Sequence, residues 1–289
     1  MKTAARPPGK PVPFALKRLM IGAFGLSSIA AADPGKQALA VDQVLAAERS
    51  FAEEADRIGI VPAFRQYVGA DAVMFLPRPI IINPRLSTAH WPGDLDWRPE
   101  YIAVSSDGGT AVTFGPSAWR VGAEVEHGVY LTIWTRGADG WRFILDRNAP
   151  MSQDLYGRPE APLVRSFSVA APDGVDGLHE AMAEFDRLAA QDYAAALRQW
   201  LAPDGFVLRR DTPPQPGRPA PSGIALPTTF EPEQSGQSQD GDLAWSYGLA
   251  RWGGAAPGEG YYVRVWQRRA DGWRLSIDHL VPLDPAPAA

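Results

Sequence analysis

The 289-residue sequence contains no cysteine. This absence excludes disulfide bonds, a lipid-modified cysteine anchor and a nucleophilic thiol. Common catalytic signatures are missing as well: there is no Gly-x-Ser-x-Gly, no His-Glu-x-x-His and no phosphate-binding glycine loop. No strong catalytic motif is therefore present, and function has to be inferred from weaker features.

Basic residues are fewer than acidic ones, 28 against 33, which gives a net charge of −5. Five of the basic residues lie within Met1–Arg18, which holds no acid, so the chain without this segment has a net charge of −10. An acidic chain without a basic run is a poor partner for nucleic acids and for anionic membrane surfaces. We therefore expect neither kind of partner.

Long apolar runs are also scarce. The segment Leu19–Ala32 is apolar or small throughout, follows the basic segment and ends in three alanines. This order is typical of a secretory signal peptide, and the run is too short to cross a membrane. We predict a signal peptide over residues 1–32 and a periplasmic or secreted protein, with a disordered basic tail as the alternative.

What the sequence does contain is an internal repeat. Gly128–Pro150 and Gly260–Pro282 are identical at eleven of 23 positions at an offset of 132 residues. A period of about 132 residues is too long for a solenoid unit and indicates two similar domains. We predict a first domain over residues 38–150, a Pro/Gly/Ser-rich linker over 151–174 and a second domain over 175–284.

Each half shows the same order of elements. Apolar residues at helical spacing predict a long helix and then a short one, and period-two runs predict strands joined by Asp-Gly turns. In the first half the predicted helices are Val41–Gly59 and Pro62–Val68, and the strands are Ala72–Leu76, Asp96–Val104, Thr110–Trp119, Glu124–Thr135 and Trp141–Asn148. In the second half the helices are Val175–Ala190 and Tyr193–Leu201, and the strands are Phe206–Arg210, Thr228–Ser238, Asp242–Trp252, Gly260–Arg269 and Trp273–Leu280.

This order, with Tyr-x-x-x-Trp and Asp-Gly-Trp-Arg in the last hairpin, resembles the SnoaL-like branch of the nuclear transport factor 2-like (NTF2-like) superfamily, near the DUF4440 type. The residues that carry the resemblance are Phe51, Trp97-x-Pro99, Asp107-Gly108, Gly115, Tyr130, Trp134 and Gly140-Trp141-Arg142, with equivalents in the second half. The resemblance implies an α+β fold of two cone-like domains. In each, a curved antiparallel sheet wraps around N-terminal helices and leaves a pocket at the wide end. The superfamily holds isomerases, cyclases, hydrolases and lyases as well as binding domains, so the resemblance does not fix a function.

Strand alternation gives each sheet two distinct faces. The apolar face holds Val129, Leu131 and Ile133, and we expect it to cover the helices and line the pocket. The mixed face holds Tyr130 and Trp134, and the second half repeats both patterns. We expect the mixed faces to pack sheet against sheet as an intrachain pseudo-dimer, which allows a monomeric protein.

The same alternation places the two repeated acids, Asp146 and Asp278, on the mixed face, away from the expected pocket. We interpret them as structural partners in ion pairs or turns, although general bases in apolar pockets are the alternative. His279 continues the apolar face and is the best candidate for a catalytic base, while the first half has Arg147 at that place.

Other residues are expected near a pocket because they lie on the short helices or in the irregular segments. The predicted pocket-binding residues are Tyr67, Arg78, Trp91, Arg147, Trp200 and Arg209. Core packing is the alternative for the aromatic side chains, and solvated loop charges are the alternative for the arginines. Glu124, Glu126 and His127 form too weak a cluster for a metal site, so we expect no metal and no cofactor.

Two functions are compatible with these features. The first is the binding of a small apolar or aromatic molecule in a cone-shaped pocket, which the lack of catalytic motifs favours. The second is cofactor-independent acid/base catalysis by an isomerase, lyase or hydrolase with one active module. The difference between Arg147 and His279 argues against two identical active sites.

Overall fold

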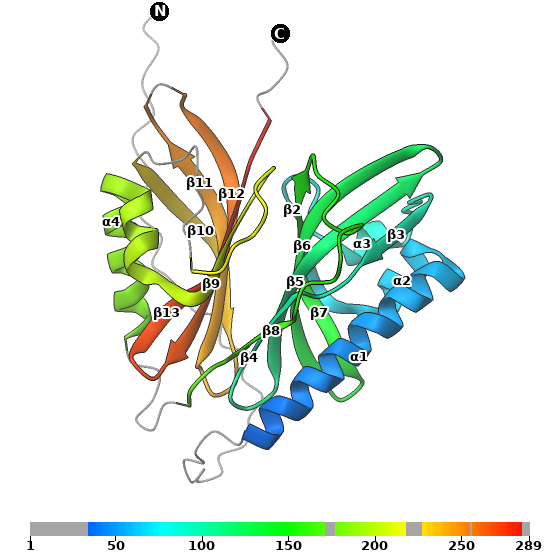
Figure 1. Cartoon of the computed structure of the whole chain (residues 1–289), viewed down its shortest axis with the longest axis horizontal. Coiled ribbons are helices and arrows are strands. Elements are labelled where there is room, and N and C mark those ends of the chain that lie inside the picture. Colours follow the sequence, from blue (N-terminus) through cyan, green and yellow to red (C-terminus); the bar gives the residue numbers. More distant parts are fainter. Residues whose placement is uncertain (1–33, 171–176, 218–226, 255, 285–289) are drawn as a thin grey trace, which may run out of the picture.

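The computed structural model describes residues 34–170, 177–217, 227–254 and 256–284. Two sheets pack face to face, and helices cover the outer side of each sheet (Figure 1). We call residues 34–170 the first unit and residues 177–284 the second unit. The predicted signal peptide and the end of the predicted linker lie outside the described residues, and the predicted domain boundaries stay predictions.

The first unit begins with two helices and continues with strands. Its elements are α1 (Pro34–Ile58), α2 (Ile60–Tyr67), β1 (Val68–Phe75), β2 (Pro79–Ile81), α3 (Asn83–Leu86), β3 (Asp94–Trp97), β4 (Tyr101–Val104), β5 (Thr110–Val121), β6 (Glu124–Gly137), β7 (Gly140–Met151) and β8 (Val164–Phe167). The strand order is β2-β1-β7-β6-β5-β4-β8, and β3 also pairs with β5. β8 comes from the predicted linker and pairs in parallel with β4, so the linker extends the first sheet.

The second unit repeats this plan with fewer elements. They are α4 (Leu178–Trp200), β9 (Leu201–Arg209), β10 (Thr228–Gln237), β11 (Leu243–Trp252), β12 (Gly258–Arg269) and β13 (Gly272–Pro282), with the strand order β10-β11-β12-β13-β9. The backbone of α4 is non-helical at Asp192, whose carboxylate accepts a hydrogen bond from the amide of Ala195 at 3.0 Å. The two helices predicted for this half are therefore the two arms of one kinked helix.

The repeated Asp-Gly-Trp-Arg sequence forms the hairpin turn that opens the last strand of each unit. Gly140 and Gly272 adopt φ values of 93° and 107°. Only glycine reaches this region without strain, so the turn depends on it. The predicted α+β fold of two cone-like units is confirmed, because each unit has a curved sheet on N-terminal helices. The sheets are mainly antiparallel, as expected, but β1 pairs in parallel with β7 and β9 with β13.

The assignment of the two sheet faces was wrong. The apolar faces of both sheets meet in one buried cluster between the units, which includes Leu131 and Ile133 from the first sheet and Val263 and Val265 from the second. The mixed faces turn toward the helices instead, where Trp134 packs edge-on against Phe51 with 6.4 Å between ring centroids. The sheets do pack against each other, but through the opposite face.

A physical reason for this arrangement is the space that each face has to fill. Two packed sheets are only about 10 Å apart, a gap that interdigitating aliphatic side chains fill well. The space between a curved sheet and its helices is wider and suits indole and phenol rings, whose polar atoms then need partners. Trp134 and Trp266 are both 1% exposed in this wider layer.

The described residues contain neither a membrane-spanning helix nor a cluster of metal-binding side chains. None of the described helices is both long and apolar enough to cross a membrane. The described ranges also hold no group of three or more histidine, aspartate or glutamate side chains that could hold a metal ion.

The aromatic contacts across the sheet interface lead to a first prediction. Phe206 of the second unit lies edge-on to Tyr101 and Phe114 of the first, at 5.4 and 4.8 Å between ring centroids. Phe206→Ala removes a buried ring and leaves a cavity, which should lower the free energy of unfolding by about 3–5 kcal/mol. Urea titration followed by tryptophan fluorescence measures this change.

Phe167→Ala is the matched control, because Phe167 is 37% exposed at the end of β8. We expect a loss below about 1 kcal/mol there. Equal losses for the two variants would contradict a shared core between the sheets.

Candidate functional site

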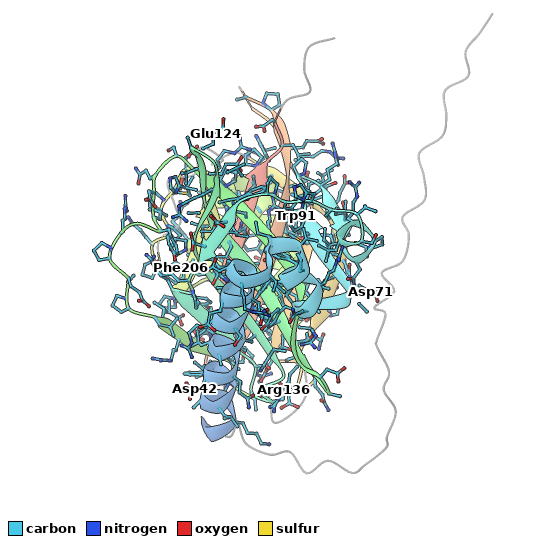
Figure 2. All side chains as sticks on the ribbon, turned by 90° about the vertical axis from the view of Figure 1, so that its right-hand side faces the viewer. Asp42, Asp71, Trp91, Glu124, Arg136 and Phe206 are labelled. Atoms are coloured by element: carbon cyan, nitrogen blue, oxygen red, sulfur yellow. The ribbon has the colours of Figure 1, made fainter. Side chains whose placement is uncertain are left out.

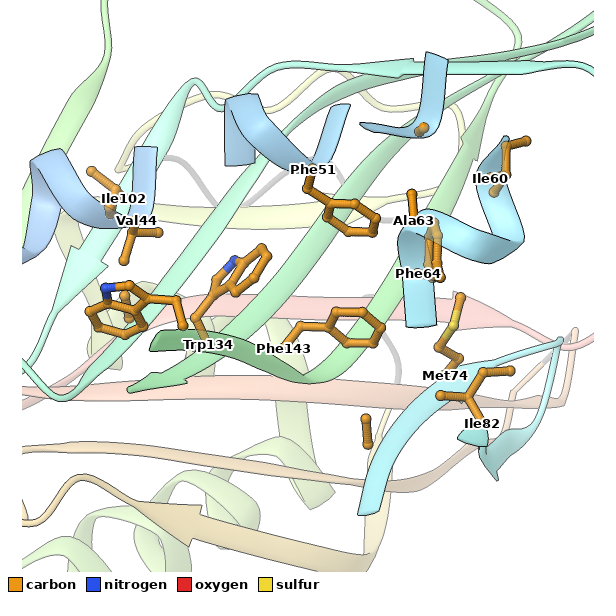
Figure 3. Close-up of a cluster of buried hydrophobic side chains, with 14 of the residues drawn as sticks. Val44, Phe51, Ile60, Ala63, Phe64, Met74, Ile82, Ile102, Trp134 and Phe143 are labelled. Carbon is orange, nitrogen blue, oxygen red and sulfur yellow. The ribbon is translucent and has the colours of Figure 1, made fainter. Parts of the chain in front are cut away.

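A cavity of about 290 Å³ opens in the first unit between the mixed face of the sheet and the helices. Seven aromatic side chains line it, and Figure 3 labels three of them, Phe51, Phe64 and Trp134, on the helices and strands around it. The other aromatic wall residues are Trp91, Trp97, Trp119 and Tyr130. Figure 2 views this helical face, with Trp91 labelled near α2. The Trp91 ring lies 5.4 Å from that of Phe64 between centroids.

Glu48 is the most deeply buried acid of the cavity wall. It projects from α1 and is 1% exposed. The indole N–H groups of Trp97 and Trp134 donate to its carboxylate at 2.8 and 3.2 Å, and the hydroxyl of Thr113 donates as well. Burial raises the pKa of Glu48 to about 7, although these donors favour the ionised form and oppose the shift. Glu48 is therefore poised between its two protonation states near neutral pH.

Asp146 on β7 is the second acid of the cavity wall. The hydroxyl of Thr132 donates to its Oδ2 atom at 2.7 Å. Its other oxygen, Oδ1, receives no hydrogen bond from the described part of the chain. Burial raises the pKa of Asp146 to about 6, and its charge in turn helps to raise the pKa of Glu48. Asp146 thus combines raised basicity with one oxygen that can contact a bound molecule.

Two neutral polar groups lie beside these acids. Burial, together with the charges of Glu48 and Asp146, raises the pKa of Tyr130 well above its ordinary value, so its hydroxyl stays protonated. That hydroxyl lies 3.5 Å from a Glu48 oxygen, to which it donates. Asn148 follows Asp146 on the same face of β7 and also lines the cavity. A Cβ atom at Gly128 would approach the Asn148 amide to 2.2 Å, so glycine at that place leaves room for it.

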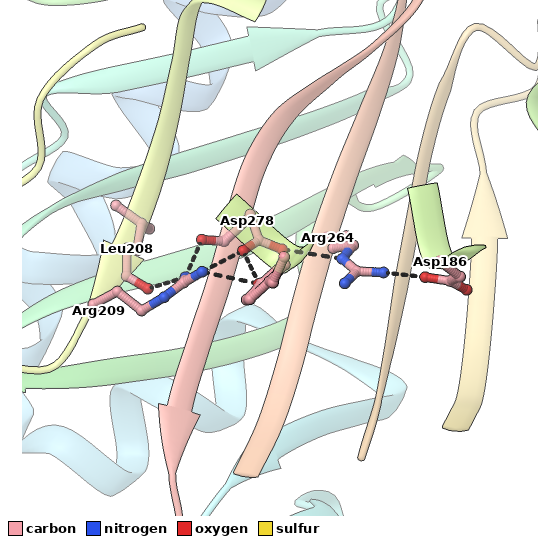
Figure 4. A network of polar contacts seen from close by, with 6 residues as sticks. Asp186, Leu208, Arg209, Arg264 and Asp278 are labelled. Carbon is pink, nitrogen blue, oxygen red and sulfur yellow. Dashed lines mark hydrogen bonds and ion pairs between the residues drawn. The ribbon is translucent and has the colours of Figure 1, made fainter. Parts of the chain in front are cut away.

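The equivalent place in the second unit is filled by an ion network (Figure 4). Arg264 stands where the first unit has Thr132, and its Nε atom donates to Asp278 at 3.0 Å. Arg209 donates to the other carboxylate oxygen at 2.5 Å, and the hydroxyl of Tyr193 donates there too. The Arg264 guanidinium also lies over the ring of Phe230, 3.7 Å from its centroid.

This network gives Asp278 the opposite protonation behaviour from Asp146. Burial alone would raise the pKa of Asp278, but the charges of Arg209 and Arg264 outweigh burial and hold the pKa below its ordinary value. Asp278 is therefore an ionised partner in buried ion pairs at neutral pH, in agreement with the ion-pair role predicted from the sequence. For Asp146 the prediction of a place outside the pocket was wrong, because the mixed face is the one that lines the cavity.

The structure places His279 away from this cavity. It is 0% exposed and lies on β13 opposite Val263, a member of the inter-sheet cluster. The expected position toward the pocket mouth was wrong for the same reason as above, since the apolar face points at the other sheet. Arg147 also lies on that face, opposite Leu131. A role of His279 as a base stays a prediction that no observation here tests.

Of the predicted pocket-binding residues, Trp91 is the one that lines the cavity. Tyr67 stacks on Phe51 at 4.7 Å, and Trp200 lies edge-on to Trp266 at 5.7 Å, so both pack in the cores. The remaining arginines have other partners: Arg78 reaches the hydroxyl of Tyr261 in the second unit at 3.4 Å, Arg147 donates to the carbonyl of Val281 at 3.4 Å, and Arg209 pairs with Asp278.

Glu48 escaped the sequence prediction, yet a signal for it was present. It follows Val44 by four residues and precedes Phe51 by three, so it lies within the apolar stripe of α1. An acid inside an apolar stripe has to be buried and needs hydrogen-bond donors, which indicates a polar site beneath the helix.

The comparisons with known proteins inform the fold alone. No protein-family model matches the sequence, and no curated protein matches it. Among solved structures, an NTF2-like protein of unknown function from Shewanella oneidensis shares 15% identity over 37% of this chain and 97% of its own, with a TM-score of 0.33. A protein of unknown function of the DUF3225 family from Pectobacterium atrosepticum shares 17% identity over 42% of this chain and 99% of its own, with a TM-score of 0.32. An NTF2-like protein with a cystatin-like fold from Novosphingobium aromaticivorans shares 16% identity over 37% of this chain and 80% of its own, with a TM-score of 0.28.

The tandem arrangement and the DUF4440 type stay predictions.

The contrast between the two acids gives a second prediction. Asp278→Asn leaves the buried Arg209 without its counter-ion and Arg264 with Asp186 alone, and should lower the free energy of unfolding by about 3–5 kcal/mol. Because the folded state raises the pKa of Asp146, the stability that this group contributes is full below its unfolded pKa and is lost as the pH rises through about 6. Asp146→Asn should therefore be neutral or stabilising at about pH 8.

Urea titrations of both variants at that pH measure the difference. Similar losses of stability in the two variants would contradict the assignment of different roles to the two acids.

Proposed function

We propose that the first unit binds a small, mainly apolar molecule and moves a proton on it, with Asp146 as the general base. The observation that carries this proposal is the state of Asp146. Its pKa is raised to about 6, it borders an aromatic cavity, and its Oδ1 atom has no hydrogen bond from the described residues. A base with these properties is ionised at neutral pH and is more basic than an ordinary aspartate.

The cavity limits the class of substrate. Its volume of about 290 Å³ lies at the small end of ligand pockets, which span about 300–1,000 Å³. The walls are mostly aromatic and aliphatic, while the polar groups gather around Glu48, Tyr130 and Asp146. A flat molecule of one or two rings with a single carbonyl or hydroxyl group suits this distribution.

The chemistry that suits these groups is proton abstraction next to a carbonyl. The C–H bond breaks, its proton moves to Oδ1 of Asp146, and the electron pair moves onto the carbonyl oxygen to give an enolate. The side-chain amide of Asn148, whose own oxygen accepts from Ser117, can donate a hydrogen bond to that oxygen. Return of the proton to another carbon completes an isomerisation, and a substrate with a leaving group would instead undergo elimination. Neither course needs a cofactor.

Binding without chemistry is the second candidate, and the ring of donors around Glu48 favours it. Both oxygens of Glu48 already accept hydrogen bonds from the protein, so this acid can serve as a fixed polar wall. The two candidates share the cavity and differ in whether Asp146 exchanges a proton with the bound molecule.

A third prediction separates them with 1-indanone, a flat bicyclic ketone. In D₂O the protein should speed the exchange of the protons next to the carbonyl, as followed by ¹H NMR. The rate should rise as the pH passes about 6, where Asp146 loses its proton. Asp146→Asn should slow the exchange by about 10²- to 10⁴-fold, the usual contribution of a general base.

Two further variants complete the design. Thr132→Arg copies the arginine of the second unit and should fill the cavity, so both the binding of 1-indanone and its exchange should be lost. Asp139→Asn, in the exposed turn of the same hairpin, should change neither. Binding of 1-indanone without proton exchange would support the binding function and contradict the catalytic one. An unchanged exchange rate in Asp146→Asn would overturn the role of Asp146 as the base.

A further inference from the structure

Between the two sheets lies a second polar cluster that the proposed function does not use. Arg147 on β7 and His279 on β13 are equivalent positions of the repeat, and they are 3% and 0% exposed. β7 and β13 approach each other to within 8 Å between Cα atoms. Arg147 and His279, the position at which the two repeats differ, therefore lie at the contact between the units.

The side chain of Arg147 runs close to His279. Its Nη2 atom donates to the carbonyl of Val281 at 3.4 Å. His279 precedes Val281 by two residues on the same face of β13, and two residues along a strand span about 7 Å. The guanidinium therefore lies in the same stretch of the interface as the imidazole, and its charge acts on His279.

Both side chains keep buried polar atoms without a partner. In the part of the chain that the structure describes, Nε and Nη1 of Arg147 have no hydrogen-bond acceptor, and both ring nitrogens of His279 are without a partner. Buried donors are nearly always satisfied in folded proteins, by protein groups, water or ions. Several unsatisfied donors at one buried place therefore indicate an acceptor that the chain itself does not supply.

The charges at this place do not balance either. Arg147 has no ion pair with any described residue, and its guanidinium rests on the ring of Phe75, 4.3 Å from the centroid. The nearby Arg209 is already neutralised by Asp278. Burial and the charge of Arg209 lower the pKa of Arg147 to about 9, so it still carries a charge at neutral pH. Burial, with Arg147 and Arg209, lowers the pKa of His279 well below its ordinary value, so the imidazole is neutral and offers one N–H.

We propose that Arg147 and His279 form a site for one small monovalent anion, a halide, between the two units. One negative charge would balance Arg147, and a monatomic ion needs the least room in an interface where both side chains are buried. The anion would accept from Nε or Nη1 of Arg147 and from the N–H of His279. It would thereby join the two units at the position where the repeats have diverged.

The site is tested by thermal unfolding at neutral pH and constant ionic strength, with sodium gluconate replaced stepwise by sodium chloride or bromide. We expect a saturable rise of the midpoint by roughly 2–4 °C. Arg147→Met should remove the halide-dependent rise and still fold, because replacing a buried charge by an apolar side chain of similar volume is often tolerated. His279→Leu is a second variant, which removes the imidazole donor alone and should weaken the rise.

Arg136→Met is the matched control, because Arg136 is exposed at the end of β6 and its loss should leave the halide effect unchanged. Crystals grown in sodium bromide should show an anomalous peak between Arg147 and His279. The proposal is overturned if chloride and gluconate give the same midpoint, if Arg147→Met keeps the full halide effect, or if the anomalous map shows no peak there.

Discussion

The burial of two apolar sheet faces against each other determines the rest of this structure. Strand side chains alternate between two faces, so once the aliphatic face of each sheet is turned to the other sheet, every Tyr, Trp and Asp of the mixed face must turn to the helices. The polar and ionisable side chains therefore line the inside of the cones. Leu131 and Val263 lie in the core between the sheets. Tyr130 and Trp134, on the other face of β6, border the cavity.

The two cones then differ in what fills the space inside. In the first unit, Thr132 leaves room beside Asp146, and the cavity stays open. In the second unit, Arg264 reaches into the same region and pairs with Asp278. The same aspartate in two copies of one hairpin therefore has a raised pKa in one unit and is a fixed counter-ion in the other.

The order of elements and the hairpin turns could be predicted because they depend on local rules, whereas the cone-like shape of each unit was an implication of the family resemblance. The hairpin with Gly140 and its copy with Gly272 were recognised from spacing alone. Alternation showed that each strand has two faces, but it could not show which face meets the helices, since that depends on packing between elements distant in sequence. The error on Asp146 and on the position of His279 follows from this single missing fact. Glu48 could have been recognised as an acid within an apolar stripe, whereas its donors come from β3, β5 and β6 and become visible only in the fold.

The most direct test of the different roles of the two cones is a ¹³C NMR titration of side-chain carboxyl groups in the intact protein. Glu48 should titrate at about 7 and Asp146 at about 6, while Asp278 should stay ionised to a pH below the ordinary aspartate value. Titration of Glu48, Asp146 and Asp278 all at ordinary carboxyl values would contradict the proposal that the first unit holds a site prepared for proton transfer.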